Sequence, residues 1–139
     1  MGPRESLNNY LRSVRRKPFV WGSHDCLTFT NDAFKAMHGV GWADDWLGRY
    51  MDGSRILRKN ELKLEFRHQN FFSAVDDRLH RVDCVPPLGA LVTTDKARRW
   101  VTGVAMGICV GTKAAFLDKA GVIYLPIDDI NGAWVKNEV

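Results

Sequence analysis

The sequence contains no long hydrophobic run, and none of its apolar stretches approaches the length that crossing a bilayer requires. Residues 1–18, MGPRESLNNYLRSVRRKP, are polar and basic and lack the hydrophobic segment of a secretory signal. Internal repeats and low-complexity tracts are also absent. We therefore expect a protein that is made in the cytoplasm and forms one domain over residues 1–139, because a hydrophobic content of 45% is enough for one core.

Cysteine is scarce, and its three positions, Cys26, Cys84 and Cys109, lie far apart. No CxxC pair occurs, which argues against a zinc ribbon. An odd number of cysteines without an export signal argues against a disulfide framework. We expect no metal and no cofactor, and we expect Cys84 and Cys109 to be packed in apolar, strand-like surroundings.

A strong excess of one charge sign is also absent, because 20 Lys and Arg oppose 16 Asp and Glu, for a net charge of +4. One basic cluster lies near the N-terminus and consists of Arg12, Arg15, Arg16 and Lys17. Such a cluster can contact nucleic acid or anionic lipid, or it can be the solvated end of a helix whose dipole favours cations. No basic–aromatic pattern accompanies it, which favours the solvated helix end. No nucleic-acid partner is expected, and a nucleic-acid binder is the weakest alternative.

Two helices are predicted in the N-terminal part of the chain. The first covers residues 3–17, where apolar residues recur at i, i+3, i+4 and i+7. The second covers residues 25–38, with Ser23 and Asp25 as candidates for its N-cap. This places Cys26 in the first turn of a mostly buried helix.

The rest of the chain changes from helical to strand-like patterning. Residues 39–72 are predicted to form a packed loop with short helical turns. Within this region and after it, a helix is expected over 54–64 and another helical piece within 66–79. Strands are expected over residues 90–94, 101–110, 114–117 and 121–125, with a final edge strand over 132–135. Helices followed by a small antiparallel sheet predict an α+β domain.

Cys26 is the candidate nucleophile. A thiolate is the reactive form of cysteine, and the first turn of a helix can lower a thiol pKa to roughly 3.5–7.5. Catalysis also needs a general base, nearly always a histidine, on another element. The competing interpretation is a small residue that is simply packed on the buried face of the helix.

The stretch WGSHDC (21–26), which opens a helix ahead of a small antiparallel sheet, resembles the NlpC-like branch of the papain-like cysteine peptidase superfamily. More narrowly, the sequence is similar to a family found in phage and prophage tail gene clusters. Further stretches that correspond to that family are PPLGALV (86–92), MGICVG (106–111) and GAWVK (132–136). The resemblance covers most of the chain in outline and implies an NlpC/papain-like fold.

One departure from the superfamily concerns the general base. In active members the strand that ends in Gly-Ile-aromatic-x-Gly begins with the catalytic histidine, and on this sequence that position is Ala105. Alanine cannot accept a proton. His24 could approach the sulfur of Cys26, whereas His38 lies at the far end of the helix, roughly 18 Å away. The positions of the two remaining histidines are not predicted; these are His68 and His80.

Four further residues each have two interpretations. Gly22 and Asp25 either shape and cap the helix start or belong to an oxyanion site built from its backbone N–H groups. The carboxylate of Asp25 would oppose thiolate formation, which favours the capping role. Trp42 and Trp46 are candidates for an exposed contact with a partner, although packing in the core is the commoner use of such residues.

Two functions follow from the resemblance. The first is a structural and assembly protein of a phage or prophage tail tip or baseplate, made in the bacterial host cytoplasm and then carried in the virion tail. It would keep the NlpC-like fold without its chemistry and would bind other tail proteins of the hub, distal tail or fibre type. The second is an active cysteine peptidase or amidase that cleaves peptidoglycan peptides during genome entry, with Cys26 as nucleophile and His24 as a candidate base.

Overall fold

The computed structural model describes residues 2–68, 70–97 and 103–137. Its elements, in chain order, are α1 (Pro3–Val14), α2 (Cys26–His38), η1 (Asp44–Trp46), β1 (Met51–Asp52), β2 (Arg55–Ile56), α3 (Lys59–Phe66), α4 (Phe71–Asp76), β3 (Leu79–Arg81), β4 (Leu91–Thr94), β5 (Ala105–Cys109), β6 (Lys113–Asp118), β7 (Gly121–Pro126), η2 (Ile127–Asp129) and β8 (Ile130–Lys136).

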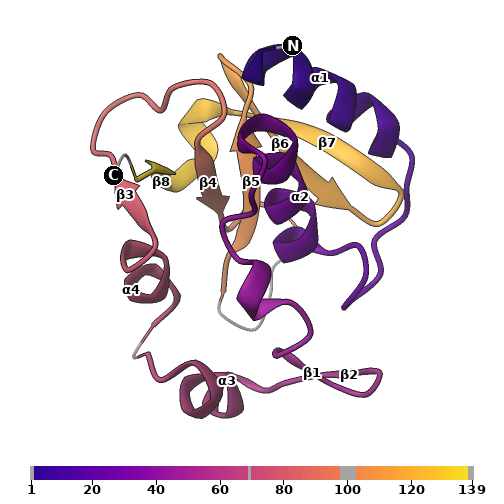
Figure 1. The fold of residues 1–139 in the computed structure, drawn as a ribbon, viewed down its shortest axis with the longest axis vertical. Helices are drawn as coiled ribbons and strands as arrows, with labels where there is room; N and C mark the ends of the chain where they lie inside the picture. The colour runs from indigo at the N-terminus through magenta and orange to yellow at the C-terminus, as the bar shows by residue number, and fades with distance from the viewer. Residues whose placement is uncertain (1, 69, 98–102, 138–139) are drawn as a thin grey trace.

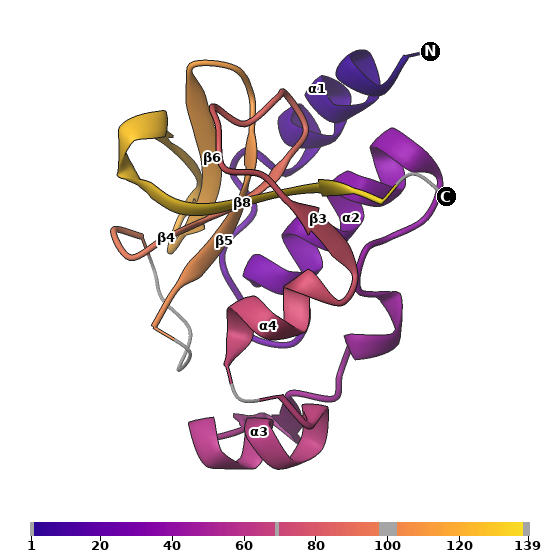
Figure 2. The ribbon, with the colours of Figure 1, turned by 90° about the vertical axis from the view of Figure 1, so that its left-hand side faces the viewer.

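The main sheet has six antiparallel strands in the order β3-β8-β4-β5-β6-β7 (Figure 1). Helices α1 and α2 pack on one face of this curled sheet, as the view in Figure 2 shows. The predicted α+β class is confirmed. The order of helices and strands is only partly as expected, because the separate hairpin β1–β2 lies between α2 and α3, and β3 follows α4 ahead of the other strands of the main sheet.

The last strand is not at the edge, and that prediction was wrong. β8 lies between β3 and β4, with Trp134 opposite Leu91 on one side and opposite Arg81 on the other. The indole of Trp134 is fully buried, and its Nε1 donates to Asp76 at 2.8 Å. A strand that carries such a side chain inward is stabilised by neighbours on both sides.

Both N-terminal helices were predicted correctly, with small differences at their ends. α1 buries Leu7, Leu11 and Val14 and ends at Val14, so the basic residues that follow are exposed, as the solvated helix end requires. α2 begins at Cys26 after the N-cap residue Asp25 and ends before Gly39, which is left-handed with φ 82°. Glycine is the usual residue in that conformation because it lacks Cβ.

The two faces of the sheet contribute to two hydrophobic clusters. The larger cluster lies between the sheet and the helices and includes Cys26, Met106 and Ile108. The second lies on the opposite face and is rich in small side chains, among them Ala90, Ala105, Ala114 and Ala133. Half-buried residues of the curled sheet and of η2 pack against this second cluster.

A small lobe, defined as residues 48–68, extends away from the sheet and lies at the bottom of Figures 1 and 2. It contains the hairpin β1–β2 and helix α3. The helix predicted over 54–64 therefore begins later, at Lys59, because residues 51–56 form the hairpin, whose turn includes Gly53 with φ 61°. α4 lies within the helical piece that the sequence predicted over 66–79.

Trp42 and Trp46 lie in the core and not on the surface. Their rings meet edge to face at 5.3 Å, and the indole N–H of Trp42 donates to Thr30 Oγ1 at 3.1 Å. Core packing, the commoner interpretation, therefore holds for both residues. No helix within residues 2–68, 70–97 and 103–137 combines the length and apolar character needed to span a bilayer.

Candidate functional site at the start of helix α2

The turn before α2 is organised by one buried carboxylate, that of Asp25. Its Oδ1 accepts the backbone N–H of Thr28 at 3.0 Å and the Thr28 hydroxyl at 3.3 Å. Its Oδ2 accepts the backbone N–H of Gly22 at 2.8 Å and the hydroxyl of Tyr50. Asp25 is fully buried, so these donors replace water around the charge.

The same residues also satisfy the other polar groups of the turn. The backbone N–H of Asp25 donates to Thr28 Oγ1 at 2.8 Å, which completes a reciprocal capping box. Gly22 has φ +88°, a conformation that glycine adopts without strain. The predicted capping role of Asp25 is confirmed. Both oxygens of its carboxylate accept hydrogen bonds from groups of the fold.

Tyr50 is the member of this site that sequence reasoning missed. It is fully buried, and its pKa is raised by burial and then by the neighbouring charge of Asp25. It lies at the start of the lobe, 25 residues after Asp25. No periodicity in residues 39–50 marks this contact, so the sequence carried no signal for it.

Cys26 is 2% exposed, and its environment favours the neutral thiol. Burial raises its pKa to about 12, and the charge of Asp25 acts in the same direction. Backbone N–H groups of Met106, Cys26 and Leu27 oppose this shift by hydrogen bonding to the sulfur, but burial outweighs them. A thiol with this pKa is not ionised at neutral pH, and the thiolate is the nucleophilic form.

The contact with Met106 gives Cys26 a structural role. The N–H of Cys109 donates to Ala90 O at 2.9 Å, on the β4 side of β5. Because N–H directions alternate along a strand, the N–H of Met106 points to the opposite side, toward β6. The β5–β6 ladder ends at Gly107, so β6 provides no partner there. The sulfur of Cys26 accepts this N–H instead, which satisfies a buried donor.

Ala105, the expected histidine position, lies on the other face of β5. Its side chain belongs to the small-residue cluster, whereas Cys26 packs with Met106 and Ile108. Gly107 confirms this alternation, because a Cβ there would meet the ring of Phe116, a member of the same small-residue cluster. A side chain at position 105 therefore points away from the sulfur, and Met106 is the β5 residue on the Cys26 side.

His24 is buried beside α2 and packs against Phe29. Its ring lies edge-on to Phe29 at 6.3 Å, and its Nε2 has no hydrogen-bond partner among the described residues. Burial lowers the pKa of His24, the charge of Lys17 lowers it further, and Asp25 and Asp32 partly offset these effects.

The other three histidines lie away from Cys26. His38 ends α2 and His80 lies exposed in β3, and both line one open depression, whereas His68 forms an ion pair with Asp77 at 3.2 Å. Within the described part of the chain, no hydrogen bond or ion pair of any of the four histidines involves Cys26.

An open depression lies over the outer side of the same turn. Its lining includes Trp21, Gly22, Gly48 and Met51, and it contains neither Cys26 nor Asp25. The side chain of Met51 covers Gly22, since a Cβ there would lie 3.4 Å from Met51 Cγ. The lobe thus supplies both the hydroxyl that binds Asp25 and the side chain that covers the turn.

The cysteines are all free thiols, and the expectation for one of them was wrong. Cys109 is buried in β5 as expected, but Cys84 is exposed, because the segment before Pro86 and Pro87 forms a loop and not a strand. Within residues 2–68, 70–97 and 103–137 there is no group of three or more His, Cys, Asp and Glu side chains that could hold a metal ion.

The fold and the site thus define an α+β domain with a capped helix start and a buried thiol. Residues 3–135 match the model of the family described as a domain of unknown function (DUF6950). The chain therefore belongs to this family. No curated protein matches the sequence.

Proposed function

We propose that the protein is a structural and assembly component of a phage or prophage tail tip or baseplate, with a papain-like fold of the NlpC type that no longer performs peptidase chemistry. The observation that carries this proposal is the state of Cys26, which is buried, bonded to the N–H of Met106 and held as a thiol with a pKa of about 12. Its partners are other tail or baseplate proteins, and it is made in the host cytoplasm before it enters the virion.

Two further features support the loss of chemistry. The carboxylate of Asp25 is occupied by donors of the turn and of Tyr50, so it is not available to orient a base. The strand opposite the helix start carries Ala105 and Met106, neither of which accepts a proton. A fold can persist as a docking module after its chemistry is lost. The assignment to a tail rests on the sequence resemblance of the WGSHDC stretch and its companions.

The test is complementation in the phage or prophage that carries the gene. The gene is deleted, and wild-type, Cys26→Ser and Cys109→Ser alleles are supplied from a plasmid. We expect the deletion to abolish complete tails in electron micrographs and both serine variants to restore infectious particles, because the hydroxyl of Cys26→Ser still accepts the N–H of Met106. Normal tails from the deletion mutant would contradict the proposal. Loss of infectivity by Cys26→Ser alone would favour an enzyme.

A second function, a cysteine peptidase or amidase, is favoured by one specific observation. The backbone N–H groups of Cys26, Leu27 and Met106 converge on the sulfur, an arrangement that can also stabilise an anion. For this function the lobe would have to move, because Met51 and Tyr50 cover the turn. The test is hydrolysis of a peptidoglycan stem peptide by the purified protein. Activity that is lost in Cys26→Ser and kept in Cys109→Ser would establish a peptidase and would contradict the proposal that the fold is inactive.

A further inference from the structure

A depression of about 620 Å³ lies where the main sheet ends between β4 and β8, and we call it the β8 depression. Its walls include the last turn of α2, the loop before β4, the C-terminal end of β8 and the first residue of α1. Among the described residues that line it, none belongs to the Cys26 site or to the lobe. The volume lies within the range of small-molecule sites.

The β8 depression is open because the loop before β4 bonds to β5 instead of β8. The N–H of Gly89 donates to Cys109 O at 2.8 Å. Trp134 is therefore the last residue of β8 that pairs with β4. Gly89 is left-handed, with φ +90°, and a Cβ there would lie 2.9 Å from Met37 Sδ, so the loop is in close contact with α2. The walls are thus held by the fold itself, which lowers the cost of binding a ligand.

Lys136 and His38 lie on the same side of the sheet. The side chain of Trp134 belongs to the cluster beneath the helices, so that of Lys136, two residues later, extends to the same face. His38 ends α2, which covers that face (Figure 2). Burial lowers the pKa of His38 and the charge of Lys136 lowers it further, an effect that requires the two groups to be close. His80 pairs with Val135 and therefore extends to the opposite face.

A backbone donor adds to these two side chains. The N–H of Val82 donates to Ala133 O at 3.0 Å, on the β3 side of β8. Because N–H and C=O directions alternate along a strand, the N–H of Lys136 points to the β4 side. β4 begins at Leu91 and provides no partner there. Within the described residues, neither the Lys136 ammonium nor the His38 imidazole forms an ion pair.

The composition of the lining defines the class of ligand. No Asp or Glu is among the described residues that line the β8 depression, so a metal cation has no counter-charge there. At neutral pH the charge comes from Lys136 and not from His38, and one positive charge matches a monoanion better than a doubly charged phosphate. A hollow with one lysine also does not provide the broad cationic face that a nucleic-acid backbone or an anionic bilayer requires.

The rest of the lining is largely apolar, and its apolar members are Pro3, Met37, Pro87, Leu88, Ala90 and Val135. A ligand that fits both halves has one negative charge and an apolar body, because burial of apolar surface contributes to binding in proportion to its area. A carboxylate on a hydrocarbon chain meets both conditions.

We propose that the β8 depression binds a carboxylate carried on an apolar body. The ammonium and N–H of Lys136 and the imidazole of His38 hold the carboxylate, while Met37, Pro87 and Leu88 contact the apolar part. Two sources supply this chemistry, a free organic acid and the C-terminal carboxylate of a peptide. The inference depends neither on a role in a tail nor on the state of Cys26.

The test is binding of small probes to the purified protein, followed through backbone amide shifts in NMR spectra. The probes are hexanoate, acetate, hexanol and inorganic phosphate. We expect hexanoate to bind about tenfold more tightly than acetate or hexanol, because only hexanoate contacts both halves of the lining. The shifts should be centred on residues 37–38, 87–90 and 135–137. Tighter binding of phosphate than of hexanoate, or shifts centred elsewhere, would overturn the proposal.

Substitution of Lys136 tests the charge. Lys136→Met removes the ammonium and keeps the length of the side chain, so it should weaken hexanoate binding about tenfold or more. The matched control is Lys63→Met, an exposed lysine in the lobe, which should bind hexanoate as wild type does. Amide spectra of each variant verify that it is folded. Equal affinities of the two variants would refute the proposal.

The pH dependence tests His38. Among the described residues, the other titratable groups of the lining are Lys136, which stays charged at these pH values, and His80. Protonation of His38 adds a positive charge beside the carboxylate, so hexanoate should bind more tightly as the pH falls from about 8 to about 6. His38→Gln should remove this increase, and His80→Gln, on the opposite face, should keep it. The reverse pattern would overturn the assigned contact.

A short peptide separates the two sources of the carboxylate. The probes are Ala-Ala-Leu with a free C-terminus and the same peptide with a C-terminal amide. Tighter binding of the free peptide than of hexanoate identifies a protein terminus as the natural ligand, and weaker binding identifies a free acid. Binding of the amide as tightly as the free peptide would overturn the role of the carboxylate.

Discussion

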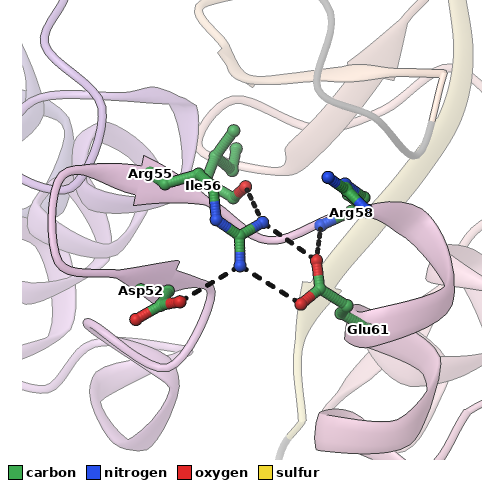
Figure 3. A network of polar contacts seen from close by, with 5 residues as sticks. All are labelled: Asp52, Arg55, Ile56, Arg58 and Glu61. Carbon is green, nitrogen blue, oxygen red and sulfur yellow. Dashed lines mark hydrogen bonds and ion pairs between the residues drawn. The ribbon is translucent and has the colours of Figure 1, made fainter.

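A carboxylate near the start of each of the helices α2 and α3 accepts a backbone N–H hydrogen bond, but the two carboxylates lie in opposite surroundings. Asp25 is fully buried and is satisfied by uncharged donors, including the hydroxyl of Tyr50. Glu61 lies near the surface and is held by the guanidinium of Arg55 together with the N–H of Arg58. The buried group fixes the start of α2 in the core, whereas the surface group joins the hairpin β1–β2 to α3 (Figure 3).

The largest change in stability is expected when the buried carboxylate of Asp25 is removed. Asp25→Ala leaves the N–H groups of Gly22 and Thr28 and the hydroxyl of Tyr50 without their acceptor, and we expect the free energy of unfolding to fall by about 4 kcal/mol. Urea unfolding measures this loss. The control is Asp44→Ala, whose half-exposed carboxylate accepts Asn31 Nδ2 at 2.7 Å and whose loss should cost about 1 kcal/mol. Equal losses would contradict the special role of Asp25.

The next largest effect is expected from substitutions on the two faces of β5. Ala105→His places an imidazole in the small-residue cluster, so we expect a loss of about 3 kcal/mol and no change in the alkylation rate of Cys26 at neutral pH. Met106→His places the imidazole on the face of the sulfur and should accelerate alkylation. Faster alkylation in Ala105→His than in Met106→His would show that the strand presents position 105 to the thiol after all.

A smaller effect is expected from the thiol itself. Cys26→Ala removes the acceptor for the N–H of Met106 and should lower the free energy of unfolding by about 2 kcal/mol. Cys26→Ser keeps an acceptor at that position and should lose about half as much. The difference between the two unfolding free energies, measured in urea, reports the contribution of this hydrogen bond. Equal stability of the alanine and serine variants would show that the hydrogen bond contributes nothing.

The smallest effect concerns the exposed carboxylate of the lobe. Arg55, together with the N–H of Arg58, lowers the pKa of Glu61 to about 2 from its usual 4.5. Since the folded-state pKa is below the unfolded value, the stabilisation by Glu61 is present above pH 4.5 and is lost as the pH falls through about 2. The stability difference between wild type and Glu61→Gln should shrink over that range in urea titrations. If the free energies of unfolding of wild type and Glu61→Gln differ by a constant amount down to about pH 2, the ion pair does not stabilise the fold.

The parts of the fold that depend on local sequence could be predicted. The spacing of Leu7, Leu11 and Val14 is sufficient for α1, and the capping preference of Asp25 fixes the start of α2. The positions of β4 to β7 followed from short apolar runs separated by turn signals, although residues 101 and 102 of the strand predicted over 101–110 lie outside the described residues. These features depend on neighbours within a few residues, and the sequence contains that information directly.

The parts that depend on distant contacts could not be predicted. The place of β8 between β3 and β4 is set by strand pairing across the sheet, and the two-residue strands of the hairpin β1–β2 are too short for a periodic signal. In the site, the contact of Tyr50 with Asp25 joins a loop to a helix start. The alignment with peptidases gave position 105 for the base, but only the register of β5 against α2 determines which face that side chain takes.

The most direct test of the buried, non-nucleophilic thiol is the pH dependence of alkylation in the folded protein, resolved for each cysteine by peptide mass spectrometry. The exposed Cys84 is an internal reference, and the protein in urea gives the rate of an unprotected Cys26. We predict that the exposed Cys84 reacts readily, while Cys26 reacts far more slowly, with its apparent pKa raised toward 12. Rapid alkylation of Cys26 with an apparent pKa below about 8.5, the value of a free thiol, would contradict the account and identify an activated nucleophile.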